Sequence, residues 1–281
     1  MSDSPSAMRA LEAILRLPDD AIDLGQAALL IARQEYPDLE VDRYLGVLDD
    51  MGTELRSRLR GGEGATSRIA HLNRYLFDDL GFRGNVDEYE DPRNSFLNDV
   101  LDRRTGIPIS LSTVYLEVGR RCGFPLAGVS FPGHFLVRDT GVDTGTDLLV
   151  DPFNRGIMLT PEDCRKRLDA MFGGGVEFRP EILRRARNRE ILERMLANLR
   201  VIWDRASDVR RALRTQNVLL ILRPDSPAHL RDRGLLRYRA VLLAEAAADL
   251  EGYLAAAPRA PDALAIRSQI VRLKALSPVM N

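Results

Sequence analysis

His134 and Asp151 are the residues of this 281-residue chain whose types and spacing best fit catalysis. We expect one β-strand to start at His134 and a later strand to end at Asp151, so that the two side chains face each other across an antiparallel pair. A carboxylate that accepts a hydrogen bond from imidazole fixes the tautomer and orientation of the ring, as general-base catalysis requires. The same bond could equally hold two strands together without any chemistry.

The two cysteines, Cys122 and Cys164, are poor candidates for the nucleophile. Cys122 lies at the C-terminal end of an expected helix, where the dipole opposes a thiolate, so we interpret it as a small buried hydrophobic residue. Cys164 lies in the first turns of its helix, but Glu162 and Asp163 flank it and should raise the pKa of its thiol. Two cysteines cannot form a disulfide framework, and they suit a reducing cytoplasm.

No cofactor or metal site is expected. The three histidines are far apart and no cysteine pair has the spacing of zinc ligands. The glycine run at 172–178 lacks the Lys-Ser/Thr ending of a phosphate-binding loop. Asn94 and Asn98 could donate an amide hydrogen to an oxyanion. The alternative is that Asn94 caps a helix and Asn98 bonds a nearby loop.

Helices and short strands must position these residues. Apolar residues three or four apart from Val41 onward predict an amphipathic helix, with Asp38 as its N-cap. Thr160, followed by a proline and two acids, predicts another helix start. The remaining expected helices cover about 6–16, 20–35, 66–79, 94–104 and 108–121, and the expected strands cover 126–131, 134–138, 147–151 and 156–159.

The C-terminal third reads as helices, with one internal spacing that matches a repeat. Gly234, Ala246, Leu250 and Pro258 lie 12, 4 and 8 residues apart, like the small-residue and proline positions of a 34-residue tetratricopeptide repeat. The aromatic positions of that repeat are absent, so a plain pair of antiparallel helices is the alternative. We therefore expect three segments, 1–60 (N-terminal helices), 61–179 (α+β core) and 180–281 (helical).

Composition narrows the classes of partner. The net charge is -1, and no apolar run approaches the roughly 18–20 residues of a membrane helix. The charge is uneven, because residues 1–52 carry 11 acids and 4 arginines whereas residues 179–214 carry 11 arginines and 5 acids. The near-zero total favours pairing of these segments within one chain, or head to tail in a homodimer, over binding of nucleic acid.

Three stretches resemble a known family. The order helix, then His on a strand, then Asp-Pro on a later strand is similar to the transglutaminase-like superfamily. More narrowly, the stretches DPRNSFLNDVLDRRTGIPISLS, FPGHFLVR and DPFN resemble bacterial SirB-type proteins, in which such a core precedes tetratricopeptide-type helices. The resemblance covers about residues 40–275. It implies a papain-like α+β core and assigns the triad His and Asp to His134 and Asp151.

The cysteine of that family does not carry over. Transglutaminases place it two residues after a glycine at the helix start, and here Gly106 plus two is Pro108. The nearest hydroxyls belong to Ser110 and Ser112, about 200° and 40° around the helix from position 108. Ser112 would share the face of position 108 but lie one turn further in. Ser110 could serve only if the helix started late or the register shifted by two.

Two functions of different classes remain open. The first is a non-catalytic transglutaminase-like protein, a regulatory module whose core binds a peptide or protein partner. The second is an acyl-transfer or amide-hydrolysing enzyme in which Ser110 or Ser112 replaces cysteine, with His134 as base and Asp151 as orienting group. A serine hydroxyl is a weaker nucleophile than a thiolate and needs the base within about 3 Å. We therefore favour the first function.

Overall fold

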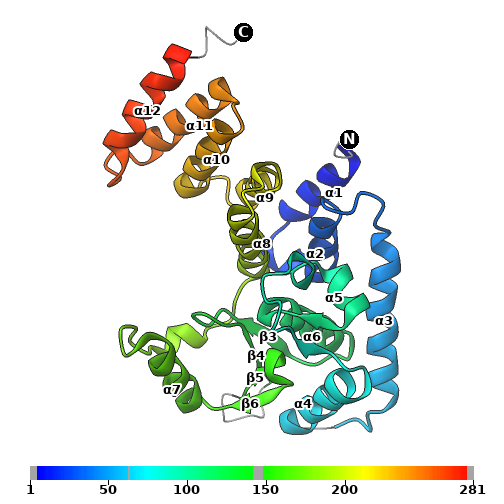
Figure 1. Ribbon diagram of the computed structural model, residues 1–281. Helices are drawn as coiled ribbons and strands as arrows, with labels where there is room; N and C mark the ends of the chain where they lie inside the picture. The colour runs from blue at the N-terminus through cyan, green and yellow to red at the C-terminus, as the bar shows by residue number, and fades with distance from the viewer. Residues whose placement is uncertain (1–4, 63, 142–147, 277–281) are drawn as a thin grey trace. The chain divides into compact units, whose positions relative to one another are not determined.

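The computed structural model describes residues 5–62, 64–141 and 148–276. The chain divides into two compact units, Met1–Met195 and Leu196–Asn281. The first unit has a mixed α+β architecture, and the second consists of helices (Figure 1). The N-terminal helices belong to the same unit as the sheet because they pack directly on its central helix.

The N-terminal part of the first unit is helical. Asp23 caps one of these helices by accepting a hydrogen bond from the Gln26 backbone N–H at 2.8 Å. The predicted amphipathic helix from Val41 is confirmed, with Leu48 and Leu55 on its buried face, but its N-cap is Glu40 rather than Asp38. The elements are α1 (Pro5–Leu15), η1 (Asp19–Ala21), α2 (Leu24–Ala32), α3 (Val41–Ser57), α4 (Ala65–Asn73) and the π-helical turn η2 (Arg74–Asp79).

Helix α6 (Pro108–Arg121) is the centre of this unit and has the bounds that the sequence predicted. It is buried from Pro108 to Gly119 and contacts α2, α3, α5 and the sheet. The predicted helix 94–104 is shorter, because Asp91 first caps a 3-10 turn. The elements before α6 are β1 (Arg83–Gly84), η3 (Pro92–Asn94), α5 (Leu97–Arg103) and β2 (Thr105–Gly106), with β1 parallel to β2.

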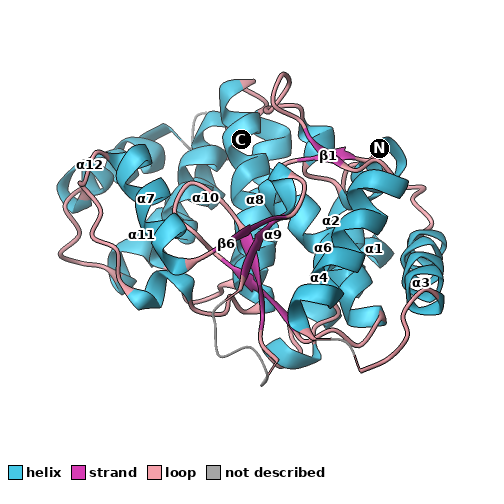
Figure 2. Ribbon diagram, turned by 90° about the horizontal axis from the view of Figure 1, so that it is seen from below, coloured by secondary structure: helices cyan, strands magenta, loops and turns pink. Residues whose placement is uncertain are grey.

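A four-stranded antiparallel sheet follows α6, with strand order β3-β4-β5-β6. It lies between α6 on one face and α7 (Pro161–Phe172) on the other (Figures 1 and 2). Thr160 starts α7 with the predicted capping box. The strands are β3 (Leu126–Val129), β4 (Leu136–Asp139), β5 (Leu149–Asp151) and β6 (Ile157–Leu159), with the turn η5 (Pro152–Asn154) between the last two. Residue 147 of the predicted third strand lies outside the described residues.

The expected strand start at His134 is wrong, because β4 begins at Leu136. Gly133 has φ of +68°, and the His134 backbone N–H donates to the Phe131 carbonyl oxygen at 3.1 Å. The segment Pro132–Gly133–His134 is therefore a turn rather than extended chain. His134 thus lies in the turn two residues before β4 instead of within the strand.

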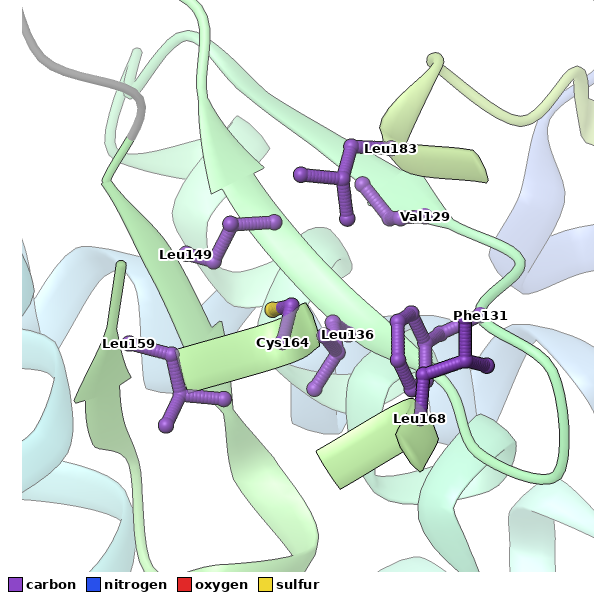
Figure 3. Packing of buried hydrophobic residues seen from close by; sticks show 8 residues of the cluster. All are labelled: Val129, Phe131, Leu136, Leu149, Leu159, Cys164, Leu168 and Leu183. Atoms are coloured by element: carbon purple, nitrogen blue, oxygen red, sulfur yellow. The ribbon is translucent and has the colours of Figure 1, made fainter. Parts of the chain in front are cut away.

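Apolar side chains from the sheet and α7 form a small core of their own on the α7 face (Figure 3). Phe131, from the turn before β4, lies against Leu168 of α7 in this cluster. The eight buried members are Val129, Phe131, Leu136, Leu149, Leu159, Cys164, Leu168 and Leu183. This packing fixes the turn that carries His134 relative to α7.

The acidic N-terminal region and the arginine-rich segment meet at the start of α8 (Asn188–Arg205). The Asp19 carboxylate accepts hydrogen bonds from the backbone N–H groups of Asn188 and Arg189 at 3.0 and 2.9 Å. The expected contact within one chain is therefore present. It is a helix cap on backbone amides rather than a set of surface ion pairs.

In the second unit, the helices from α9 to α12 stack in sequence, each against the next. A Cβ atom on Gly234 would lie 2.8 Å from two Leu250 side-chain carbons, so the small residue lets two helices approach closely. Ala246 and Leu250 are fully buried, as the repeat spacing predicted. The elements are the end of α8, α9 (Val209–Leu222), α10 (Pro227–Arg239), α11 (Leu243–Ala256) and α12 (Ala263–Leu276), with η6 (Pro180–Leu183) preceding α8 in the first unit.

Candidate functional site

His134 and Asp151 are brought together as predicted. The His134 Nε2 atom lies 2.8 Å from the Asp151 Oδ1 atom. Strand pairing contributes to this approach, because Val137 of β4 lies opposite Val150 of β5; Asp151 directly follows Val150, and His134 lies three residues before Val137. The His134 side chain is 15% exposed and that of Asp151 is 0% exposed. The carboxylate is therefore buried under a ring that still reaches solvent.

Three further hydrogen bonds hold Asp151. Asn154 donates its backbone N–H to Oδ1 at 3.2 Å and its side-chain amide to Oδ2 at 2.7 Å. Arg167 of α7 donates Nη1–H to Oδ2 at 2.6 Å. Burial raises the pKa of Asp151, but the hydrogen bond and charge of His134, with the bonds from Asn154 and Arg167, outweigh it and lower the pKa to about 2. The carboxylate is thus ionised and oriented at neutral pH.

The imidazole of His134 is held by aromatic residues as well as by Asp151. Its ring meets Phe153 edge-on, with centroids 5.9 Å apart and planes at 82°. Phe153 in turn meets the Tyr89 ring edge-on at 6.2 Å. Because Nε2 faces Asp151, Nδ1 is the nitrogen left for another group, and it forms no hydrogen bond within the described chain. This arrangement could orient a base or hold a ligand.

Ser110, the first predicted serine candidate, is committed to the backbone. Its Oγ donates to the Asn94 carbonyl oxygen at 2.6 Å and accepts from the Ile107 N–H at 3.0 Å. The Ile107 carbonyl oxygen lies 3.1 Å from the same hydroxyl. With 0% exposure, this hydroxyl joins the N-terminus of α6 to the preceding loop.

Ser112 and Asn98 are buried, and within the described residues neither forms a hydrogen bond with His134 or Asp151. The Ser112 Oγ and the Asn98 Oδ1 atoms have no hydrogen-bond partner in the part of the chain that the structure describes. Asn94 is not a helix cap, because the N-cap of α5 is Phe96. Its amide donates to the Glu88 carbonyl oxygen at 2.7 Å and so closes the preceding loop.

Both thiols lie in environments that oppose a thiolate. Burial raises the pKa of Cys122, whose Sγ lies 3.3 Å from the Gly52 carbonyl oxygen. Burial also raises the pKa of Cys164 to about 11, although Arg167 opposes the shift and Asp163 adds to it. The expected direction for Cys164 holds, but the main cause is burial in the α7-face core rather than the flanking acids.

Several residues around His134 were not found from the sequence. Asn154 could have been found, because the sequence Asp-Pro-x-Asn is typical of a turn in which the aspartate carboxylate accepts hydrogen bonds from the asparagine. No local sequence pattern marks Arg167 or Phe153 as a site residue, because their contacts depend on how α7 and η5 pack against the sheet. Phe153 belongs to η5, which contacts both α6 and β1, and a Cβ on Gly84 of β1 would lie 2.7 Å from the Phe153 ring.

The described residues contain neither a metal-ligand cluster nor a helix that could span a membrane. No group of three or more His, Cys, Asp or Glu side chains in 5–62, 64–141 and 148–276 is arranged to hold a metal ion. Over the same ranges, none of the helices combines the length and the apolar character needed to cross a bilayer.

Comparison with known proteins gives two regions of similarity. Residues 42–197 match a family described as the transglutaminase-like superfamily, and residues 199–271 match a tetratricopeptide-repeat family. A UPF0162 protein of Xylella fastidiosa is 43% identical over 258 residues, 91% of each chain. A UPF0162 protein of Pseudomonas aeruginosa is 34% identical over 76% of this chain and 77% of its own. Human F-box only protein 21 is 34% identical over 67% of this chain and 34% of its own. No solved structure matches.

Proposed function

The chain belongs to the transglutaminase-like superfamily and, within it, groups with the UPF0162 proteins, and we propose that it is a non-catalytic member that binds a peptide or protein segment beside His134. The finer likeness to SirB-type proteins is part of this proposal. So is action in a reducing cytoplasm, which the two free thiols support.

One observation carries the proposal, namely that α6 starts with Pro108 where the family pattern has its cysteine. Proline has no nucleophilic atom, yet the oriented histidine and buried aspartate are both retained. An imidazole at 15% exposure, edged by Phe153 and near the half-exposed Tyr89, offers a ligand both a polar atom and apolar surface. These features suit binding better than acyl transfer.

The serine-enzyme alternative lacks support from these contacts. A serine acts as a nucleophile only when a base within hydrogen-bond reach takes its proton. The proton of Ser110 goes to the Asn94 carbonyl oxygen, and Ser112 is fully buried in α6. Labelling of Ser110 or Ser112 by a fluorophosphonate probe, abolished by His134→Ala, would overturn the non-catalytic proposal. We expect no labelling of either serine.

A protein or peptide is the proposed ligand because the second unit matches a tetratricopeptide family, whose helices are common protein-binding scaffolds. The test is selection of peptides from a random 12-residue display library on the full chain, followed by fluorescence anisotropy. We expect His134→Ala to weaken the selected peptides at least tenfold. His71→Ala, a partly buried histidine on α4 of the same unit, is the matched control and should change affinity little.

Failure would take two forms. If no peptide is enriched, the binding proposal is wrong. If peptides bind wild type and His134→Ala equally, the site lies elsewhere; loss of affinity on Tyr238→Ala, an exposed tyrosine of α10, would then place it on the second unit.

A further inference from the structure

Arg194 of α8 borders the turn that carries His134. Its Nη1–H group donates to the Ser130 hydroxyl and to the Phe131 carbonyl oxygen, each at 2.9 Å. The same Phe131 oxygen accepts the backbone N–H of His134 at 3.1 Å. The guanidinium and the backbone of His134 therefore meet at one carbonyl oxygen.

One edge of this guanidinium has no partner. Nε and Nη2 of Arg194 form no hydrogen bond, and no carboxylate forms an ion pair with the group, in residues 5–62, 64–141 and 148–276. Neither nitrogen is fully buried, so this edge of the half-buried side chain reaches solvent.

Elsewhere in this chain the same edge binds carboxylates. Arg233 directs Nε and Nη2 to the two Asp249 oxygens at 2.8 and 2.7 Å. Arg165 does the same to Glu162 at 2.8 and 2.6 Å. This side-on, two-bond geometry is the strong way for arginine to hold a carboxylate. Arg194 has the same edge without the carboxylate.

The surroundings of Arg194 favour binding of an external anion, because they remove part of the water that would otherwise solvate the guanidinium. Its guanidinium carbon lies 5.7 Å from the centre of the Phe135 ring, and burial lowers the pKa of Arg194. Burial also raises the pKa of Tyr89, which the nearby charge of Arg194 opposes. Tyr89 is 46% exposed. A cation that has lost part of its hydration gains more from a counter-ion than a fully exposed one.

We propose that the Nε–Nη2 edge of Arg194 binds a carboxylate of the peptide partner, next to His134. This inference rests on the proposed function and narrows it to peptides that present an acidic side chain or a free C-terminus. Met171 and Phe172, which approach Gly133 at the end of α7, supply apolar contact for a residue beside that carboxylate.

The first experiment needs no peptide. The full chain is labelled with 15N-arginine, and the Nε–Hε signal of Arg194 is identified by its loss in Arg194→Lys. Titration with sodium acetate, against sodium chloride at equal ionic strength, should shift this signal saturably. Acetamide should not shift it, and the Nε–Hε signal of the exposed Arg187 should show no saturable shift.

The second experiment uses the selected peptides. Replacing each acidic residue by its amide, or amidating the C-terminus, shows which source supplies the carboxylate. When the carboxylate that Arg194 binds is converted to an amide, the peptide should bind wild type at least tenfold more weakly. The same change should weaken binding to Arg194→Gln much less. Arg194→Lys keeps the charge but not the two-donor edge, so we expect it to weaken binding as well. Arg187→Gln removes the same charge nearby and should leave binding unchanged.

The outcomes separate the two proposals. Peptides that bind through His134 but tolerate both amidations, or no saturable acetate shift, would overturn the role of Arg194 and leave peptide binding in place. An acetate shift without any selected peptide would support the anion site and contradict the peptide-binding function. A loss of folding in Arg194→Gln, seen by circular dichroism, leaves Arg194→Lys and the acetate titration to decide.

Discussion

Asp151 in the first unit and Asp249 in the second are both buried aspartates that accept hydrogen bonds from arginine, yet their carboxylates have different roles. Asp249 of α11 accepts three hydrogen bonds, two from Arg233 and one from Arg237 at 2.6 Å, and both arginines lie one turn apart on α10. Asp151 accepts from one arginine, an asparagine and an imidazole. The first arrangement joins two helices, whereas the second orients a ring at the surface.

The difference lies in the partners. The arginines around Asp249 stay charged at every relevant pH, so their ion pairs fasten α10 to α11. The Nδ1 atom of His134, in contrast, forms no hydrogen bond within the described residues and is left for a ligand. A buried carboxylate therefore stabilises the fold in one unit and presents a functional group in the other.

Asp249→Asn should give the largest effect. It leaves two arginines without their counter-charge, and we expect the second unit to lose about 3 kcal/mol, the low end for breaking a buried ion pair, because both arginines keep some contact with water. Urea unfolding followed by fluorescence of Trp203, the only tryptophan, monitors this unit. The control is Glu251→Gln, on the same helix as Asp249, which removes an exposed ion pair with Lys274 of α12. It should lose less than about 1 kcal/mol of unfolding free energy. Equal losses would show that the ion pairs of Asp249 contribute no more to stability than an exposed pair does.

An intermediate effect should appear in the pH dependence of Asp151. Its pKa is lowered from the ordinary 3.8 to about 2, so the ionised carboxylate stabilises the fold above pH 3.8 and this contribution is lost as the pH falls through 2. The difference in unfolding free energy between wild type and Asp151→Asn should thus be about 2 kcal/mol larger at pH 5 than near pH 2. Guanidinium unfolding followed by circular dichroism measures it. A difference independent of pH would mean that Asp151 is not held as an anion.

The smallest effect on stability should come from Arg167→Gln. The Arg167 side chain is 34% exposed, and we expect a loss of about 1 kcal/mol or less. The informative readout is the Asp151 carboxyl 13C titration, because losing one of the bonds that lower its pKa should move that pKa upward. Arg165→Gln, two residues earlier and paired with Glu162, should leave the titration unchanged. An unchanged titration in both variants would assign the shift to His134 and Asn154 alone.

Sequence patterns predicted the elements whose causes are local. The bounds of α6 follow from Pro108 and Gly123, and the start of α7 follows from the Thr160 capping box. The pairing of His134 with Asp151 was also foreseen. The start of β4 was predicted two residues too early, because the turn before it is fixed by the hydrogen bond to the Phe131 carbonyl oxygen and not by apolar alternation.

Long-range contacts could not be predicted in this way. Asn94 looked like a helix cap, but its amide is used by a loop that precedes it. Arg194 and Arg167 stand among forty basic residues, and nothing local marks them as the ones beside Asp151 and His134. Their position depends on α7 and α8 packing against the sheet, which a single sequence does not display.

The burial of α6 on all sides also has a consequence for synthesis on the ribosome. Helices α2, α3 and α5 precede α6, but the sheet that covers its remaining face is complete only at Leu159, 38 residues after Arg121. At about 5–20 residues per second, that face stays uncovered for about 2–8 s during translation. The nascent chain therefore presents an apolar surface to chaperones in this interval, and slower translation between Arg121 and Leu159 would lengthen the exposure.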